Sequence, residues 1–359
     1  MNILAIETSC DETAAAVVTS GRRIVSSVVL SQDEVHAPYG GVVPELASRQ
    51  HLRSIGYIVN ESLERASMKT ADIDAFAVTQ GPGLIGSLLV GLSFAKGLAY
   101  YHRKPLLGID HLEAHIESAF LENPAIPFPA IALLVSGGHT SLFHLKKRLH
   151  FRVLGRTRDD AAGEAMDKIA KFLGLGYPGG PVIERLAAGG DPERFAFALP
   201  RMKDHSLDFS FSGLKTAALR WIGETKMSGK HGHLADFLAS FEAAVVRALL
   251  ENVTGAIERH RPVSLILCGG VARNKRLREG FGALARTSGL SAFIPSPTLC
   301  TDNAAMVAAL AAERMQRAGK PRRWLDLDAY PRFNPATGGP GKGRVRAPST
   351  RPSDGRAGG

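Results

Sequence analysis

Cysteine is scarce in this chain of 359 residues. Its three cysteines, Cys10, Cys268 and Cys300, lie far apart and form no CxxC pair. This excludes a zinc ribbon and a disulfide scaffold, and it indicates a reducing compartment. No apolar run approaches the roughly 18 residues that span a bilayer, and the start, MNILAIETSCDE, lacks the basic region of a signal peptide. We therefore expect a cytoplasmic protein without a membrane partner.

Acidic residues are the minority among the charged ones: 34 Asp and Glu stand against 44 Lys and Arg, a net charge of +10. Residues 334–359 hold seven Gly, four Pro, five Lys or Arg and a single Asp, which is +4. We predict that this segment is disordered, because it has too little apolar surface to offset the entropy of ordering. The remaining charge, 10 − 4 = +6, fits a polyanionic partner such as RNA, although many basic proteins bind none.

Apolar and glycine-rich segments recur in the same order in two halves of the chain. Each half predicts a strand pair joined by a short turn, a third strand, a helix, and then strand, helix, strand and helix. The first half comprises strands 2–7, 14–18 and 23–30, helix 52–66, strand 75–79, helix 86–100, strand 106–109 and helix 113–120. The second half comprises strands 131–135, 141–145 and 151–155, helix 161–173, strand 265–267, helix 274–285, strand 292–294 and helix 303–317.

This order, βββαβαβα twice, predicts an α/β fold of duplicated lobes that face each other across a cleft. We place an N-terminal lobe at 1–118 and a second lobe at 119–333, with insertions at about 174–260 and a last helix that can pack back on the first lobe. The loops that follow the strands should line the cleft. The architecture resembles the actin-like ATPase and sugar kinase superfamily.

The segment DHLEAH contains two histidines, His111 and His115, four residues apart. At this spacing both side chains lie on one face of a helix, which suits metal ligation; the alternative is a pair of surface histidines. The zincin motif is excluded because Glu113 does not directly follow His111. The equivalent junction of the second half contains Asp302, which would meet both histidines across the pseudo-twofold axis. Two His and one carboxylate suit Fe(II) or Zn(II).

Three further glycine turns are candidate ligand loops. The hairpin turn 136–140, SGGHT, can present backbone N–H groups to a phosphate, or it can simply be a tight hairpin. The turn 268–274 ends a strand and opens a helix, where Asn274 can contact an anion or ribose or can serve only as the N-cap. The turn 177–181 contains Gly179 and Gly180. The GxGxxG match at 81–86 follows an antiparallel meander and contains a proline, so we reject a dinucleotide site there.

Several polar residues near these turns have both a chemical and a structural interpretation. Asp167 lies in a small-residue and apolar stretch and can point into the cleft, or it can be a solvated helix carboxylate. His139 can act as a general base or can cap the hairpin. Cys10 has no evident histidine partner in the sequence, so we expect a buried loop cysteine and not a nucleophile.

Nine segments together resemble the TsaD family, the tRNA threonylcarbamoyladenosine biosynthesis proteins. The resemblance covers about residues 1–333, and its motifs occur in order and unbroken. They are IETSCDET at 6–13, HAPYGGVVPELASRQH at 36–51, GPGLIGSLLVG at 81–91, HLEAH at 111–115, VSGGHT at 135–140, GEAMDK at 163–168, GYPGGP at 176–181, FSFSGLKT at 209–216 and CTDNAAM at 300–306.

The resemblance implies transfer of a threonylcarbamoyl group from L-threonylcarbamoyl-AMP to N6 of adenosine 37 in tRNAs that read ANN codons, with release of AMP. It implies one divalent metal, Fe(II) favoured and Zn(II) as the alternative, on His111, His115 and Asp302. For the proton acceptor we consider Asp11, Glu12 and His139. The implied contacts to the adenylate and the threonylcarbamoyl group are Leu134, Val135, Ser136, Gly137, Gly138, Asp167, Gly180 and Asn274.

The bacterial members of this family are expected to act with a TsaB-like paralogue and a TsaE-like P-loop ATPase, and helix 86–100 can belong either to such an interface or to the core. Two other functions compete with the transferase. A metalloprotease would need a glutamate directly after His111, and the sequence lacks it. A nucleotide-driven kinase or chaperone would explain the fold and the loops, but not a metal triad at the strand-to-helix junctions.

Overall fold

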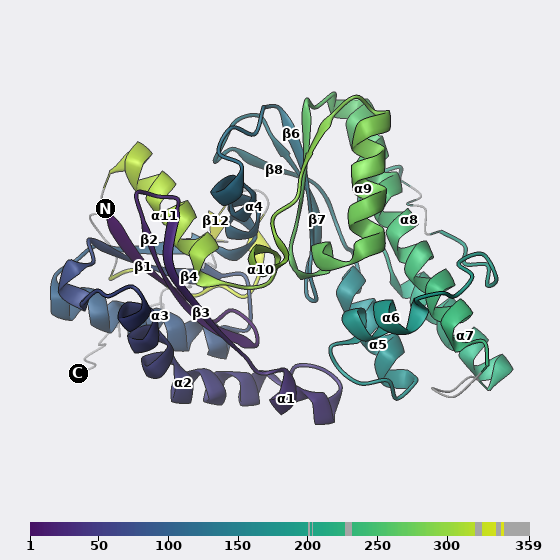
Figure 1. Ribbon diagram of the computed structural model, residues 1–359, viewed down its shortest axis with the longest axis horizontal. Coiled ribbons are helices and arrows are strands. Elements are labelled where there is room, and N and C mark those ends of the chain that lie inside the picture. Colours follow the sequence, from purple (N-terminus) through teal and green to yellow (C-terminus); the bar gives the residue numbers. More distant parts are fainter. Residues whose placement is uncertain (200–201, 203, 227–231, 320–324, 335–338, 341–359) are drawn as a thin grey trace, which may run out of the picture.

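The computed structural model of the protein describes residues 1–199, 202, 204–226, 232–319, 325–334 and 339–340. Two lobes lie side by side, and each is built on one five-stranded mixed sheet (Figure 1). In the part of the chain that is described, no helix is both long and apolar enough to cross a membrane.

Both sheets have the same strand order, which confirms the predicted duplication. The first sheet has the order β3-β2-β1-β4-β5, and the second, read from its other edge, has the order β8-β7-β6-β9-β10. In each sheet the first three strands are antiparallel neighbours and the last two run parallel to the first. The strands are β1 (Asn2–Glu7), β2 (Glu12–Thr19), β3 (Arg23–Ser31), β4 (Ala75–Gly81), β5 (Leu106–Asp110), β6 (Ala130–Val135), β7 (Thr140–Leu145), β8 (Phe151–Arg156), β9 (Ser264–Cys268) and β10 (Ser291–Phe293).

Helices fill the connections between these strands. In the first half they are α1 (Asp33–His36), α2 (Pro44–Arg65), α3 (Ile85–His102) and α4 (His111–Glu122). In the second half they are α5 (Ala162–Phe172), α6 (Gly179–Ala187), α7 (Ser212–Thr225), α8 (Leu234–His260), α9 (Lys275–Thr287), α10 (Pro297–Cys300) and α11 (Ala304–Ala318). Strands β6 and β7 are buried along their whole length, as expected where helices cover both faces of a sheet.

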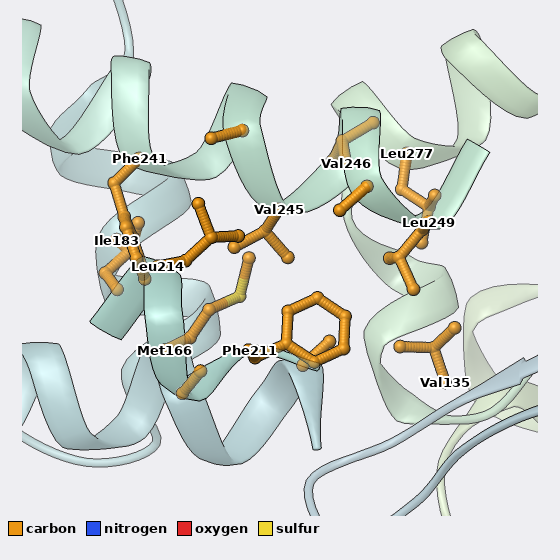
Figure 2. Close-up of a cluster of buried hydrophobic side chains, with 14 of the residues drawn as sticks. Val135, Met166, Ile183, Phe211, Leu214, Phe241, Val245, Val246, Leu249 and Leu277 are labelled. Atoms are coloured by element: carbon orange, nitrogen blue, oxygen red, sulfur yellow. The ribbon is translucent and has the colours of Figure 1, made fainter. Parts of the chain in front are cut away.

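The core of the second lobe lies between its sheet and helices α5 to α9. Figure 2 shows Met166 of α5, Leu214 of α7 and Val245 of α8 gathered around Phe211. All four side chains are at most 1 % exposed. This packing fixes the position of α5, whose first turn lies against the hairpin of β6 and β7.

The last helix of each half packs on the sheet of the other half. Helix α4 places Leu112, Ile116 and Phe120 in the cluster that contains β6 and β9. The alanine-rich helix α11 packs against β1 and β2, because its small side chains permit a close approach to the sheet. The two helices therefore contact each other, and residues at their N-terminal ends come together.

The predicted disordered segment 334–359 lies almost wholly outside the described residues. Its described residues are Asn334, Gly339 and Pro340. These belong to a short antiparallel pair, β11 (Phe333–Asn334) and β12 (Gly339–Pro340). For the rest of the segment, disorder stays a prediction.

Candidate metal centre and substrate loops

The two histidines of the DHLEAH segment lie in the first two turns of α4. Asp110 ends β5 and caps this helix, because its Oδ1 accepts hydrogen bonds from the backbone N–H groups of Leu112 (2.9 Å) and Glu113 (3.0 Å). His111 is the first residue of the helix and His115 follows one turn later. Their ring centroids are 4.6 Å apart with the rings nearly perpendicular, so both imidazoles point to the same side.

Asp302 comes to this pair from the second half of the chain, just before α11. Asn303 caps that helix by accepting a hydrogen bond from the N–H of Met306 at 3.0 Å. The Asp302 Oδ1 atom lies 2.9 Å from His115 Nε2 and 3.7 Å from His111 Nε2. One donor atom from each of the three residues lies within 4.8 Å of the others. The structure thus brings together the residues that the repeat places at equivalent junctions.

A second carboxylate, Glu7, lies behind the cluster at the end of β1. Its Oε2 is 3.1 Å from His111 Nδ1 and accepts a hydrogen bond from Thr79 Oγ1 at 2.6 Å. Its Oε1 accepts one from the N–H of Ser9 at 2.6 Å. Because a carboxylate only accepts, the proton of neutral His111 is held on Nδ1, and the lone pair of Nε2 faces Asp302. Glu7 was not among the site residues that we predicted from the sequence. The feature that could have indicated it is a charged residue at the end of an otherwise apolar strand.

Negative charge is in excess inside this buried cluster as long as its imidazoles are neutral. Burial alone would lower the pKa of His111, but the carboxylates of Asp302 and Glu7 raise it to about 9. Burial would likewise raise the pKa of Asp302, and the two imidazoles outweigh it and hold that pKa below its ordinary value. Two carboxylates against neutral imidazoles leave a site that favours one added positive charge, whether a proton or a metal cation.

The β6–β7 hairpin turn lies next to the histidines. The N–H of Ser136 donates to the carbonyl of His139 at 2.7 Å, and the N–H of His139 donates to Ser136 Oγ at 3.1 Å. This confirms the tight hairpin. Gly137 and Gly138 form its exposed tip. The His139 ring lies 6.1 Å from that of His111, and burial together with both histidines lowers the pKa of His139 to about 3.

The first turn of α5 lies directly against this hairpin. A Cβ atom at Gly163 would stand 2.7 Å from the carbonyl oxygen of Ser136, so only glycine permits the approach. The N–H of Ala162 also donates to Thr140 Oγ1 at 2.9 Å. Leu134 and Val135, the residues before the turn, are fully buried in β6, so only their backbone can face a ligand.

Asp167 joins α5 to the start of α6 and is not a solvated carboxylate. Its Oδ1 accepts a hydrogen bond from the N–H of Gly179 at 2.7 Å, and Gly180 is a second backbone donor to it. Burial outweighs these donors, and with the nearby charge of Asp11 it raises the pKa of Asp167 to about 6.

Asn274 is the N-cap of α9, as one of its two interpretations predicts, and its contact with a ligand stays a prediction. Its Oδ1 accepts from the N–H of Leu277 at 2.9 Å, and its Nδ2 donates to Glu242 Oε1 at 2.6 Å. The same Glu242 carboxylate forms an ion pair with Arg276 at 3.0 Å. Glu242 therefore orients the Asn274 amide, a role that no local sequence pattern indicated.

The β1–β2 turn faces the second lobe. Tyr177, in the turn before α6, donates a hydrogen bond from its hydroxyl to Asp11 Oδ2 at 3.3 Å and so joins the two lobes.

Two other residues of the β1–β2 turn have raised pKa values. Burial, Asp302 and Asp11 raise the pKa of Glu12 well above its ordinary value. Burial and Asp11 also raise the pKa of the Cys10 thiol. Cys10 is only partly buried, which corrects the expected burial. A thiol that resists ionisation is nevertheless a poor nucleophile.

The duplicated α/β fold is shared by proteins of known structure. It is similar to component A of the (R)-2-hydroxyglutaryl-CoA dehydratase of Acidaminococcus fermentans (TM-score 0.52, 17% identity, 88% of this chain and 99% of that chain). It is also similar to HypF of T. kodakarensis (TM-score 0.60, 14% identity, 88% and 48%). At these identities the likeness extends to the fold alone.

The family is defined by sequence. The sequence model described as "TsaD: tRNA N6-adenosine threonylcarbamoyltransferase" matches residues 23–309. A protein of this name from Moorella thermoacetica is 49% identical over 331 residues, which cover 92% of this chain and 96% of the relative. One from Geotalea uraniireducens is 51% identical over 308 residues, 86% and 90% of the two chains. The chain belongs to the TsaD family, a family of transferases, and the resemblance read from its motifs is confirmed.

Replacing Asp167 with Asn should stabilise the protein above pH 6. A carboxyl whose pKa rises on folding, here from 3.8 to about 6, contributes stability below pH 4 that is lost as the pH rises through about 6. The amide keeps the acceptor for the Gly179 N–H but does not ionise. We expect Asp167→Asn to gain about 1–3 kcal/mol over wild type at pH 7.5 and little at pH 3.5. Urea unfolding at both pH values measures this, and a constant difference would contradict the assignment.

Proposed function

We propose that this chain transfers the threonylcarbamoyl group from L-threonylcarbamoyl-AMP to N6 of adenosine 37 in tRNAs that read ANN codons, releasing AMP in the cytoplasm. Family membership and the name of its relatives support the reaction class. The observation that carries the proposal is the buried cluster of His111, His115 and Asp302, built from both halves of the chain beside the 136–139 turn.

The donor set of the cluster fits one divalent metal ion. His111 offers Nε2 because Glu7 holds its Nδ1 proton, His115 offers Nε2, and Asp302 offers Oδ1. Two imidazoles and one carboxylate are the ligands of non-haem Fe(II) sites and also suit catalytic Zn(II). We favour Fe(II). When bound, such an ion acts as a Lewis acid toward a carbonyl or phosphoryl oxygen of the donor.

The loops supply binding and orientation. In our proposal the backbone of Ser136, Gly137 and Gly138 binds the phosphate of the adenylate, since the open glycine tip lets an anion approach the N–H groups. Leu134, Val135, Asp167, Gly180 and Asn274 surround the rest of the donor. A mixed carbamic–phosphoric anhydride is already activated, so the enzyme needs no side-chain nucleophile. The exocyclic amine of adenosine is a poor nucleophile, and its positioning supplies much of the acceleration.

We keep Asp11, Glu12 and His139 as the candidate proton acceptors. Glu12 must be ionised to serve, and burial together with Asp302 and Asp11 raises its pKa and opposes this. His139, with a pKa of about 3, is a weak base and is better suited to accept a hydrogen bond or to shape the site. Asp11 is engaged by the Tyr177 hydroxyl.

A TsaB-like paralogue and a TsaE-like ATPase are the proposed protein partners, and α3 offers a surface for the former. Its outward stripe consists of Ile85, Leu89, Ser93, Gly97 and Tyr100, all exposed and none charged. The opposite face, with Leu88, Leu92 and Ala95, is buried in the first lobe. Exposed apolar and small side chains in a row are typical of a helix that packs on a partner. The net charge of +10 suits the tRNA substrate.

The reaction is tested by transfer of labelled threonine into tRNA in a mixture of synthase, bicarbonate, ATP, the two partners and this chain. We expect label with wild type, and a loss of at least 100-fold with His111→Ala, because a ligand of the metal is removed. His150→Ala, at an exposed position of the β7–β8 connection, is the control and should keep wild-type activity.

Two outcomes would contradict this proposal. If folded His111→Ala still labels the tRNA, a metal ion held by His111 has no part in the reaction. Absence of label with wild type, although the synthase forms the adenylate, would contradict the transferase and favour the nucleotide-driven alternative.

Leu89→Glu should abolish stable association with the TsaB-like paralogue, because it places a charge in the middle of the uncharged stripe. The control is Phe172→Glu, which changes an exposed apolar side chain on the second lobe (62 % exposed, against 44 % for Leu89). Co-elution in size-exclusion chromatography measures both. If Leu89→Glu co-elutes like wild type, α3 is not the interface.

A further inference from the structure

After α11 the chain returns to the first lobe, where residues 325–332 lie across it. We call this segment the C-terminal strap. Lys96 of α3 donates to the carbonyl of Leu327 at 2.5 Å, and Gln80 at the end of β4 donates to the carbonyl of Asp328 at 2.6 Å. The N–H of Tyr330 donates to the carbonyl of Gln80 at 3.1 Å. Two of these hydrogen bonds fix the strap at the carboxyl end of β4, and the third holds it against α3.

Tyr330 lies at the innermost point of the strap and is only 7 % exposed. Its backbone approaches β4 so closely that a Cβ at Gly81 would stand 2.1 Å from the Tyr330 carbonyl oxygen. Gly81, which the rejected GxGxxG match contains, therefore has a packing role. The Tyr330 hydroxyl donates to Asp110 Oδ2 at 2.7 Å.

Asp110 is therefore shared between the strap and the metal helix. Its Oδ1 caps α4 through the N–H groups of Leu112 and Glu113, while its Oδ2 is held by Tyr330. The carboxylate is 4 % exposed, so water cannot readily replace the hydroxyl. His111 directly follows Asp110, and a rotation of the cap turns the first residue of the helix with it.

We propose that Tyr330 is a positioning residue of the metal centre. It fixes the Asp110 carboxylate, and the cap fixes the direction in which His111 Nε2 points toward Asp302. The first turn of a helix lacks internal hydrogen-bond acceptors for its N–H groups and frays unless it is capped. A metal site tolerates displacements of only about 0.5 Å in its ligands. Tyr330 acts at one remove, through the hydrogen bond of its hydroxyl to Asp110.

A second interaction holds the first turn of α4, from its other side. Glu113 of α4 forms an ion pair with Arg314 of α11, and Arg314 also donates to the carbonyl of Gly108 at 3.4 Å. The strap continues from α11, so one stretch of chain supports both sides of the turn. Loss of the Tyr330 hydroxyl should therefore loosen His111 without unfolding α4.

The test is the affinity of the full chain for Zn²⁺, measured by chelator competition, with the absorption spectrum of the Co²⁺ form as a second readout. This inference rests on the proposed metal centre. We expect Tyr330→Phe to bind Zn²⁺ about 10–100-fold more weakly than wild type and to change the Co²⁺ spectrum, since it removes only a supporting hydroxyl. The matched control, Tyr101→Phe at an 81 % exposed position, should bind as wild type does.

A double-mutant cycle separates this role from general destabilisation. Asp110→Asn keeps an acceptor for the cap but replaces the acceptor that Tyr330 uses. If the hydroxyl acts through Asp110, the double variant loses no more affinity than the larger single loss. Losses that multiply would overturn the proposal, and so would a Tyr330→Phe protein with wild-type affinity and spectrum. The transferase reaction would stand in either case, whereas failure of wild type to bind metal would refute the metal centre itself and this inference with it.

Discussion

Helix α4 begins at the edge of the first sheet but packs Leu112, Ile116 and Phe120 against the second, while α11 does the reverse. The burial of each large apolar side chain stabilises by about 1.5–3 kcal/mol, whereas a typical hydrogen bond contributes about 0.5–1.5 kcal/mol net. Packing therefore decides how α4 and α11 lie, and the polar contacts of His115 and Asp302 follow from it. We call the contact of α4 with α11 the crossing. A change in it would displace His111, His115 and Asp302 together.

Buried charge accumulates at both ends of the crossing and is paired at each. At the far end, Arg148 pairs with Glu117 of α4 and, at 2.9 Å, with Glu313 of α11, and its guanidinium lies over the Phe120 ring. At the other end, where α4 and α11 begin, the carboxylates of Glu7 and Asp302 contact imidazoles. Unlike a guanidinium, an imidazole carries a positive charge only when it is protonated. Buried ions are costly unless they are paired. A metal ion bound at this end would therefore pair with its carboxylates.

Most of the fold could be predicted from the sequence because each element occurs in both halves, and the order of the elements along the chain, the hairpins and the closing helices are confirmed. Helix α2 begins at Pro44 and not at residue 52. The prediction missed its start because the first buried positions, Ala47, His51 and Ser54, are small or polar and do not form an apolar period. The ligand cluster could be predicted because its residues sit at equivalent junctions. Its supports, Glu7 and Tyr330, could not, because they depend on contacts between residues far apart in sequence. The substrate contacts and proton acceptor stay predictions.

The central claim is that the crossing of α4 and α11 creates one metal site from two halves of the chain. Anomalous diffraction from crystals of the purified chain, recorded at the iron and zinc absorption edges, tests it most directly. The account predicts a single peak bounded by His111 Nε2, His115 Nε2 and Asp302 Oδ1, present at the iron edge. No peak between these atoms in metal-replete protein, or a peak at other side chains, would contradict it.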